Sequence, residues 1–433
     1  MNVLFIEKSL RTDKLAIMYL SAVLKAAGHT THLIWDDIES SEDYMKSHPI
    51  DVVCWSMMTC ESEWMFEKNR QLKEKFKFIS IIGGPHPTFF PDDGIKDPNV
   101  DYVVQGAGEL VINKILAGQV NTKCIRGDIP NINELPFPDR TIQYRYDEFG
   151  KARMKRFMAG RYCFFSCKYC FNDRFKRLYT DQKRSMWNRH KVSRLMEEMD
   201  GVIKTYGMEH AVMNDDDIAA DLDWLNEFCD EIKKRKIEWS GLVRASSVTK
   251  DILAKMKDSG CEFLTLAIES ANETTQKFLN RGNITNQDVE NAVKWAKELG
   301  FKVRLLSMIG LPVDDPLGDA LETLEFNMRM QPTESIISVF QPYRGTALWD
   351  YCLKKGLVDP DVKMGTFYSG SKLKIKDAKK IDSLYHWWPY AVRYQMPIDL
   401  VKILIEIEIP PDVQDKLQRY KWEFGKREFF KAS

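Results

Sequence analysis

The feature that most limits the fold of this chain is a series of short apolar runs separated by stretches with helical spacing. Within the first 125 residues, the apolar runs lie at 3–6, 52–55, 79–82 and 102–104. A helical stretch at 15–27 ends at Gly28, a common helix terminator. Near-continuous apolar strands separated by helices are typical of a parallel sheet covered on both faces. We therefore expect an α/β fold that begins with a doubly wound, Rossmann-like domain at residues 1–128.

A second series of the same kind follows a proline-rich stretch. Proline removes amide donors and disfavours helix before it, so residues 129–153 are predicted to be an extended linker. Strands are then expected at 156–159, 211–214, 239–244, 263–269, 303–309 and 335–341. The helices between them are expected at 187–206, 222–235, 249–259, 285–299 and 317–329. Six such units predict a partial (β/α)6 barrel, part of a TIM barrel, at 154–350, with its site at the strand carboxyl ends. Residues 351–433 are expected to form a helical C-terminal domain.

The composition excludes several classes of protein. The 433 residues carry 63 basic and 63 acidic side chains, and this balance argues against a nucleic-acid partner. No apolar run approaches the ~20 residues that span a bilayer, so no transmembrane segment is expected. The apolar stretch near the N-terminus is too short for a signal peptide. We expect a cytoplasmic protein.

Three of the nine cysteines, Cys163, Cys167 and Cys170, fall within eight residues. The others are scattered, and Cys229 and Cys261 are expected in the core. Structural zinc normally takes four protein ligands, and the next Cys or His after Cys170 is His190. Three thiolates on a cubane iron–sulfur cluster leave one iron open for a substrate or cofactor. The alternatives are a zinc loop completed by a distant ligand and a chance grouping of the cysteines.

With Tyr169 just before the last cysteine, this C-x3-C-x2-C loop resembles that of the radical S-adenosylmethionine (SAM) superfamily. Segments after later strands resemble the family's SAM-binding elements in the same order, and residues 342–346 resemble a P-Y-P-G-T element with Arg344 in place of the second Pro. The resemblance implies SAM contacts from Tyr169, Asn214, Asp215, Asp216, Arg244, Glu269, Ser270, Gly310, Leu311 and Pro312. Taken singly, the acidic turn at 215–217 also fits a solvated loop, Glu269 a helix cap and Gly310 a turn.

The first domain resembles the cobalamin (B12)-binding domain that precedes many radical SAM proteins, and residues 135–140 are similar to the linker of that subgroup. The resemblance implies cobalamin contacts from Met58, Thr59, Gly83, Gly84, Pro85, His86, Gly106, Gly108 and Glu109. Because the D-x-H-x-x-G motif is absent, no histidine of that motif is expected to ligate cobalt. Ala107 replaces the usual Glu of the family's G-E-G-E element. A domain that has lost cobalamin is the alternative.

The resemblance is to methyltransferases of the class B type, and it implies one [4Fe-4S] cluster, SAM and cobalamin. It also implies an external one-electron reductant such as a flavodoxin or ferredoxin. The implied reaction is reductive cleavage of SAM to a 5′-deoxyadenosyl radical, hydrogen abstraction, and methyl transfer from methylcobalamin to an unactivated carbon. The substrate would be a small molecule or biosynthetic intermediate. Two alternatives stay open: an enzyme of this type that performs cyclisation, rearrangement or oxygen insertion, and a non-catalytic cobalamin or metal sensor.

The C-terminal stretch is rich in aromatic residues, with Trp387, Trp388 and Tyr390 close together. These side chains fit either a substrate pocket or the packing of the tail onto the barrel. Further on, Met396, Leu400 and Ile403 are expected to form a buried helix face.

Overall fold

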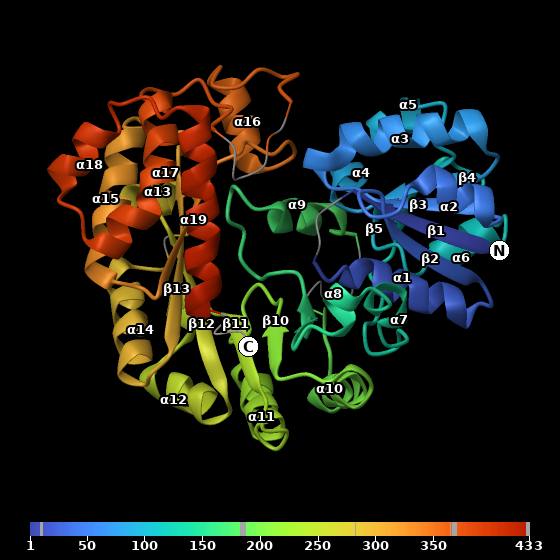
Figure 1. The fold of residues 1–433 in the computed structure, drawn as a ribbon, viewed down its shortest axis with the longest axis horizontal. Helices are drawn as coiled ribbons and strands as arrows, with labels where there is room; N and C mark the ends of the chain where they lie inside the picture. Colours follow the sequence, from blue (N-terminus) through green and yellow to red (C-terminus); the bar gives the residue numbers. More distant parts are fainter. Residues whose placement is uncertain (9–11, 182–187, 282, 364, 366–369, 430–433) are drawn as a thin grey trace. The chain divides into compact units, whose positions relative to one another are not determined.

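The computed structural model describes residues 1–8, 12–181, 188–281, 283–363, 365 and 370–429 of an α/β protein (Figure 1). The chain forms two compact units. The first unit is Met1–Gly160 with Phe175–Glu209, and the second is Arg161–Arg174 with His210–Ser433. Residues 129–153, the predicted linker, cluster with the first unit.

The first unit contains one sheet of six parallel strands in the order β2-β1-β3-β4-β5-β6. The strands are β1 (Asn2–Glu7), β2 (Thr30–Trp35), β3 (Val52–Ser56), β4 (Ile79–Gly83), β5 (Tyr102–Gly106) and β6 (Cys124–Gly127). The four predicted strands of this region are confirmed. The two that were not predicted, β2 and β6, are the edge strands, which carry polar residues and lack the continuous apolar run of a central strand.

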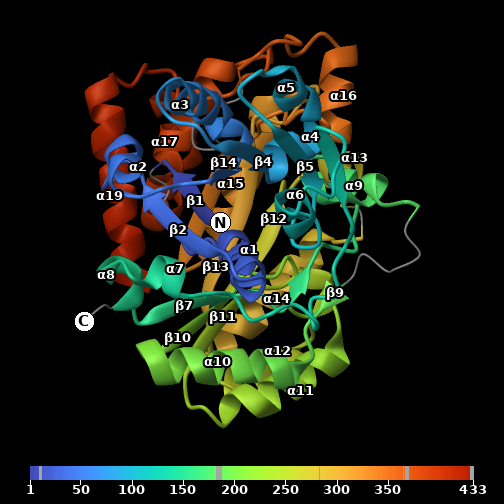
Figure 2. The same ribbon diagram turned by 90° about the vertical axis from the view of Figure 1, so that its right-hand side faces the viewer.

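Helices cover both faces of this sheet. The elements of this unit outside the sheet are α1 (Leu15–Ala26), α2 (Ser41–Ser47), η1 (Thr59–Glu61), α3 (Ser62–Lys75), α4 (Pro85–Phe89), α5 (Pro91–Lys96), α6 (Ile112–Leu116), α7 (Thr141–Tyr144), α8 (Asp147–Gly150), β7 (Met154–Phe157), β9 (Asn188–Arg189) and α10 (Val192–Tyr206). Val3 and Phe5 of β1 pack with α1 and α6, while Leu4 and Ile6 pack with α2 and α3. Figure 2 shows α4 beside β5. The alternation along β1 therefore gives the predicted doubly wound domain.

The strand order of the first unit reverses between β1 and β3, which lie side by side although β2 separates them in sequence. In open α/β sheets, ligands bind outside the carboxyl ends of the strands at such a reversal. The residues of interest in this unit are therefore those that follow β1, β3 and β4.

The second unit contains a parallel sheet in the order β14-β13-β12-β11-β10 (Figure 1). Its strands are β10 (His210–Met213), β11 (Glu238–Leu242), β12 (Cys261–Glu269), β13 (Lys302–Ile309) and β14 (Glu334–Val339). Its connecting helices are α11 (Leu222–Lys233), η2 (Ala245–Ser247), α12 (Lys250–Asp258), α13 (Glu273–Phe278), α14 (Asn286–Glu298), α15 (Pro316–Met330) and α16 (Ala347–Lys354). The predicted alternation of the partial barrel is confirmed; its first strand forms as β7. Two short elements, β8 (Gly160–Arg161) and α9 (Phe171–Leu178), span the sequence boundaries between the units. Cys229 and Cys261 are buried, as predicted.

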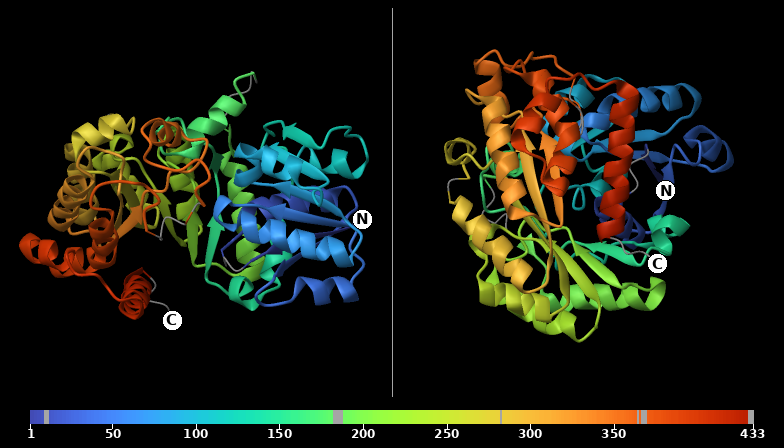
Figure 3. Two further views of the ribbon diagram at one scale, coloured as in Figure 1. Left: turned by 90° about the horizontal axis from the view of Figure 1, so that it is seen from above. Right: turned by 60° about the vertical axis from the view of Figure 1, so that its left-hand side comes forward.

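The C-terminal residues form α17 (Ala378–Tyr394), α18 (Ile398–Leu404) and α19 (Pro411–Phe429). Trp388 is fully buried, and its indole N–H donates to Ser335 Oγ of β14 at 2.8 Å. The contacts of this part of the tail with the sheet are those of α17 with β14, and Figure 3 shows the C-terminal helices in orange and red. At Trp388, the aromatic stretch therefore packs the tail onto the barrel. Within the described ranges, no helix has both the length and the apolar character that crossing a membrane requires.

The expected buried face of Leu400 and Ile403 is wrong. These side chains are 41% and 61% exposed, and the buried residues of this region are Val401 and Ile405. Residues four apart lie on the same side of a helix, so burial of Val401 and Ile405 against α17 leaves Leu400 and Ile403 on the outside.

Candidate functional site

The three clustered cysteines lie in one loop of the second unit. Cys167 is buried, while Cys163 and Cys170 are half-buried. Burial raises the pKa of the Cys170 thiol to about 12. The three cysteines lie within eight residues of one another in this loop.

The donor chemistry of this loop suits an iron–sulfur cluster, because thiolates are the ligands such clusters take. Among the residues that the structure describes, no group of three or more His, Cys, Asp or Glu side chains is already arranged to hold a metal ion. The loop therefore fits an iron–sulfur cluster in the type of its side chains and in their closeness along the sequence. Cluster binding would remove the thiol protons, since metal ligands bind deprotonated.

Backbone hydrogen bonds hold the loop to two neighbouring elements. The Lys168 N–H donates to the carbonyl of Leu279, just after α13, at 3.0 Å, and the Lys168 carbonyl accepts from Leu348 of α16 at 2.9 Å. Asn280 Nδ2 donates to the Ser166 carbonyl at 2.7 Å. The position of the loop thus depends on the segments that follow β12 and β14.

Tyr169 connects this loop to the end of β12. Its hydroxyl donates to Glu269 Oε1 at 2.9 Å and accepts from Arg281 Nη1 at 3.0 Å. Arg281 also donates to the Ala267 carbonyl at 2.6 Å and lies 3.8 Å from the Glu269 carboxylate. Burial, and then the Glu269 charge, raise the pKa of Tyr169 well above its usual value, so the phenol stays protonated.

Arg281 was not predicted from the sequence. It lies in an irregular segment after α13, where a charged residue is ordinarily exposed, yet only 6% of its surface is accessible. Its role depends on the contact with Tyr169, which is 112 residues away in sequence. No local pattern in the chain indicates that contact.

The backbone at Glu269 is unusual. Its φ is +64°, a left-handed conformation that is uncommon for a residue other than glycine, and the pairing of β12 with β13 shifts register between Ala267 and Glu269. A bulge at a strand end redirects the next side chain, and such features are frequent beside active sites. The irregularity thus sets the direction of the Glu269 side chain.

Arg244, which follows β11, contacts the cysteine loop directly. Its guanidinium carbon lies 3.7 Å from the centroid of the Phe165 ring, and Nη2 donates to Asn283 Oδ1. The side chain is 6% exposed, and burial followed by the charge of Arg281 lowers its pKa. The guanidinium stays charged because its pKa starts far above neutrality.

The acidic turn after β10 contains two kinds of carboxylate. Asp217 is buried and accepts from Ser247 Oγ at 2.9 Å and from the Arg244 backbone N–H at 3.3 Å, so it organises the neighbouring loop. Asp216 accepts from Asn172 Nδ2 at 2.9 Å, and burial raises its pKa although part of its surface is exposed. Of the other predicted SAM contacts in this turn, Asn214 is exposed and Asp215 is buried.

The remaining predicted SAM contacts lie near the ends of β12 and β13. Ser270 is fully buried and its hydroxyl donates to Asp319 at 2.7 Å. Leu311 is in the hydrophobic core, and Gly310 has a φ of +72°. Because Leu311 and Pro312 are buried, this segment offers its backbone rather than its side chains to a ligand.

In the first unit, hydrogen bonds join the loops after β3, β4 and β5 into one continuous rim. Met57 N–H donates to the Gly83 carbonyl at 2.8 Å, and the Met57 carbonyl accepts from His86 N–H at 2.9 Å. Thr88 Oγ1 accepts from the Gly106 N–H at 3.0 Å. Gly84 has a φ of +93°, and a Cβ there would lie 2.9 Å from the Met57 nitrogen, so this close approach requires glycine.

The predicted cobalamin contacts divide into accessible and buried groups. Met58 is 42% exposed, and Thr59, Gly83, Gly84, Pro85, Gly106 and Gly108 are half-buried. His86 and Glu109 are buried; His86 packs against Phe66 and Phe90. The rim after β3 and β4 therefore has accessible backbone and one exposed side chain, Met58.

The end of β5 is covered from within its own unit. The Tyr179 hydroxyl accepts from Ala107 N–H at 3.0 Å and donates to the Gly127 carbonyl at 2.8 Å. A Cβ on Gly106 would lie 1.7 Å from that hydroxyl oxygen. The glycine at this strand end thus makes room for Tyr179, a contact that the sequence did not reveal.

Glu7, at the end of β1, is a second residue that sequence reasoning missed. It is fully buried at the strand-order reversal and pairs with Lys14. Burial, opposed in part by Lys14, raises the pKa of Glu7 to about 7. The signal in the sequence was an acid directly after a four-residue apolar run.

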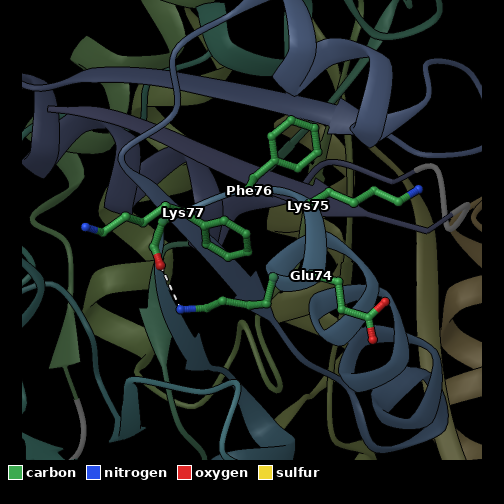
Figure 4. A pocket seen from close by; sticks show the side chains of 6 residues that line it. Glu74, Lys75, Phe76 and Lys77 are labelled. Atoms are coloured by element: carbon green, nitrogen blue, oxygen red, sulfur yellow. Dashed lines mark hydrogen bonds between the residues drawn. The ribbon is translucent and has the colours of Figure 1, made fainter.

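A surface hollow in the first unit lies away from these residues. Residues 73–78, at the end of α3, line it, and Lys73 Nζ donates to the Phe78 carbonyl at 2.7 Å (Figure 4). The hollow precedes β4, at the amino ends of the parallel strands. It contains none of the predicted cofactor contacts.

Two domain families match this chain. Residues 1–116 match the B12 binding domain, and residues 158–326 match the radical SAM superfamily. The first match covers the unit with the glycine rim, and the second includes the cysteine loop and the strand ends that surround it.

Several characterised or named proteins are similar in sequence. An uncharacterized methyltransferase of Pyrococcus horikoshii is 26% identical over 328 residues, which is 67% of this chain and 68% of that protein. Cytidylyl-2-hydroxyethylphosphonate methyltransferase of Streptomyces wedmorensis is 24% identical, covering 65% of this chain and 62% of that enzyme. The anaerobic magnesium-protoporphyrin IX monomethyl ester cyclase of Synechocystis is 25% identical, covering 51% of this chain and 48% of that enzyme. The chain thus spans less than two thirds of the latter two relatives.

Two solved structures share the fold. The cobalamin-dependent S-adenosylmethionine radical enzyme OxsB aligns with a TM-score of 0.70 at 15% identity, covering 99% of this chain and 72% of that chain. The radical S-adenosylmethionine methyltransferase TsrM from Kitasatospora setae aligns with a TM-score of 0.66 at 12% identity, covering 82% of this chain and 75% of that chain. At these identities, the likeness shows the fold.

Proposed function

From the premise that this chain is a B12-binding enzyme of the radical SAM superfamily, with one [4Fe-4S] cluster, SAM and cobalamin as cofactors, we propose that it is a methyltransferase acting on an unactivated carbon. The observation that carries the proposal is the combination, in one chain, of the glycine rim with a loop that holds three cysteines within eight residues. Two relatives named as methyltransferases support it.

When bound, the cluster with SAM supplies radical chemistry, and cobalamin supplies a transferable methyl group. We propose Cys163, Cys167 and Cys170 as the cluster ligands. Tyr169, held by Glu269 and Arg281, fixes the position of that loop.

We propose that SAM lies against the strand ends of the second unit. Asn214 and Asp216 offer polar atoms with accessible surface, and the segment at 310–312 offers backbone. For cobalamin, we propose the rim after β3 and β4, with Met58 as the accessible side chain. We also propose the domain boundaries expected from the sequence, which are 1–128, 154–350 and 351–433, with a linker at 129–153.

The proposed substrate is a small molecule or biosynthetic intermediate, and an external flavodoxin or ferredoxin is the proposed electron donor. The first experiment uses anaerobically purified, cluster-reconstituted protein with excess cobalamin and measures bound cobalamin from the visible spectrum after desalting. We expect about one cobalamin per chain. Iron and sulfide without cobalamin would overturn the proposed methyl transfer.

The second experiment gives the loaded protein SAM and dithionite, with and without cobalamin, and separates the two products of SAM. Cobalamin-dependent formation of S-adenosylhomocysteine supports methyl transfer. Formation of 5′-deoxyadenosine alone, by a protein that holds cobalamin, supports an enzyme that does not transfer methyl, an alternative that the similarity to the cyclase favours. Bound cofactors with neither product indicate a sensor.

A further inference from the structure

We propose that two buried arginines, Arg244 and Arg281, raise the reduction potential of the cluster held by the cysteine loop. Both act as buried positive charges beside this loop: Arg244 contacts the Phe165 ring, and Arg281 donates to the Tyr169 hydroxyl. The proposal rests on the cluster of the proposed function and is independent of methyl transfer.

Arg244 is held so that its charge remains beside the loop. Its guanidinium carbon lies 3.7 Å from the centroid of the Phe165 ring, two residues before Cys167, and Nη2 donates to Asn283. The Arg244 backbone N–H also donates to the buried Asp217. Charge and burial around a cluster are among the means by which proteins set its potential.

Arg281 brings a second positive charge to the same buried region. It donates to the hydroxyl of Tyr169, two residues after Cys167, and each of the two arginines is 6% exposed. Glu269 is the one carboxylate within 4 Å of Arg281 among the described residues, and Tyr169, between them, is a neutral phenol. Arg244, Arg281 and Glu269 together therefore carry a net charge of one positive unit.

One-electron reduction changes the cluster from the 2+ to the 1+ state, with the electron taken from dithionite in the test and no bond formed or broken. A fixed positive charge stabilises the form that gained the electron. The effect is large where burial keeps water from screening it. Both buried guanidinium groups therefore favour the reduced cluster, and removal of either charge should make reduction harder.

The positions of the two arginines predict different responses to lysine. Arg244→Lys keeps a charge near Cys167 and loses the planar group that stacks on Phe165. Arg281→Lys keeps a charge but cannot donate to both Tyr169 and Ala267 in the same geometry. We therefore expect Arg244→Lys and Arg281→Lys to keep a reduction potential nearer to that of the wild type than Arg244→Met and Arg281→Gln do.

The test is a redox titration of reconstituted protein with dithionite, without SAM, in which the electron paramagnetic resonance signal reports the reduced cluster. Iron and sulfide are measured first. At a fixed potential, we expect Arg244→Met to lower the ratio of reduced to oxidised cluster about tenfold, which is about 59 mV for a one-electron couple. Arg281→Gln should shift the potential in the same direction by less. Omission of SAM separates this effect from any contact of Arg244 with SAM.

Arg304→Met is the matched control, because Arg304 lies near the amino end of β13 and pairs with Glu334. Its potential should equal that of the wild type. If Arg244→Met loads poorly, Arg244→Lys and Arg244→Gln carry the comparison. Loaded Arg244 and Arg281 variants with the wild-type potential would overturn the proposal, as would an equal shift in Arg304→Met. A wild type that binds no iron would overturn the cluster assignment with it, whereas absent methyl transfer would overturn only the proposed function.

Discussion

The carboxyl edges of the two sheets are built from different chemical groups. In the first unit, the edge is a rim of backbone hydrogen bonds around glycines, with one buried ion pair, Glu7 with Lys14. In the second, it is a network of side chains in which arginine, tyrosine and glutamate surround the cysteine loop. The first edge is therefore formed mainly by backbone, and the second places charged side chains beside the cysteine loop. Each of the following predictions tests one side of this contrast.

The largest effect is expected at the cysteine loop. Replacement of Cys163, Cys167 or Cys170 by Ala should abolish iron binding, since two thiolates do not hold the cluster that three hold. Iron and sulfide per chain after reconstitution measure this. Cys60→Ala, an exposed cysteine of the first unit, is the control and should bind iron normally.

The next largest effect is expected at the glycine rim. In Gly84→Ala, the new methyl group would lie 2.9 Å from the Met57 nitrogen at a φ of +93°, so the rim must shift. We expect the free energy of unfolding to fall by about 3 kcal/mol. We also expect the variant to bind less cobalamin. Urea denaturation followed by circular dichroism measures the first quantity.

Gly118→Ala is the control for backbone strain alone, because its φ is +67° but no atom lies within 4 Å of the added Cβ. It should cost about 1 kcal/mol and leave cobalamin binding intact. Equal losses in the two variants would contradict a role for close packing in the rim.

Glu7 should make the stability of the protein depend on pH. Its pKa is raised from 4.5 in the unfolded chain to about 7 in the folded protein. Between these pH values, Glu7 is protonated more fully in the folded state than in the unfolded state. Its contribution to stability is therefore complete below pH 4.5 and is lost as the pH rises to 7. The loss over that window is about 3 kcal/mol at most.

Glu7→Gln should therefore flatten the fall in the urea midpoint between pH 5 and pH 7. Glu67→Gln, an exposed position on α3, should leave that slope unchanged. A slope that is the same in wild type and Glu7→Gln would show that the buried pair stays ionised throughout.

The smallest effect is expected for Tyr169→Phe, which removes one hydroxyl from the charged edge. Two hydrogen bonds are lost while Arg281 and Glu269 remain near each other, so we expect a loss of about 1 to 2 kcal/mol in the free energy of unfolding. Tyr351→Phe, also in the second unit, is the control, since its hydroxyl makes no hydrogen bond within the described ranges. Equal urea midpoints for the two variants would show that the Tyr169 bridge adds no stability.

Much of the fold could be predicted because central parallel strands are buried on both faces and must be apolar, as in β3, β4 and β13. The edge strands β2 and β6 were not predicted, because an edge strand is less buried than a central strand and can carry polar residues. The clustered cysteines can be recognised because they are neighbours in sequence and their spacing is itself the signal; that they ligate the cluster stays a prediction.

The residues around those cysteines could not be predicted in the same way. Arg281 meets Tyr169 across 112 residues, and Tyr179 meets Ala107 across 72. Burial of Glu7 depends on which strand lies beside β1. The sequence by itself determined the α/β alternation and the local thiol cluster, because both are patterns of near neighbours. Only the tertiary structure decided which charges are buried beside the cysteine loop and which glycines are covered, because desolvation and close contact depend on segments that folding brings together.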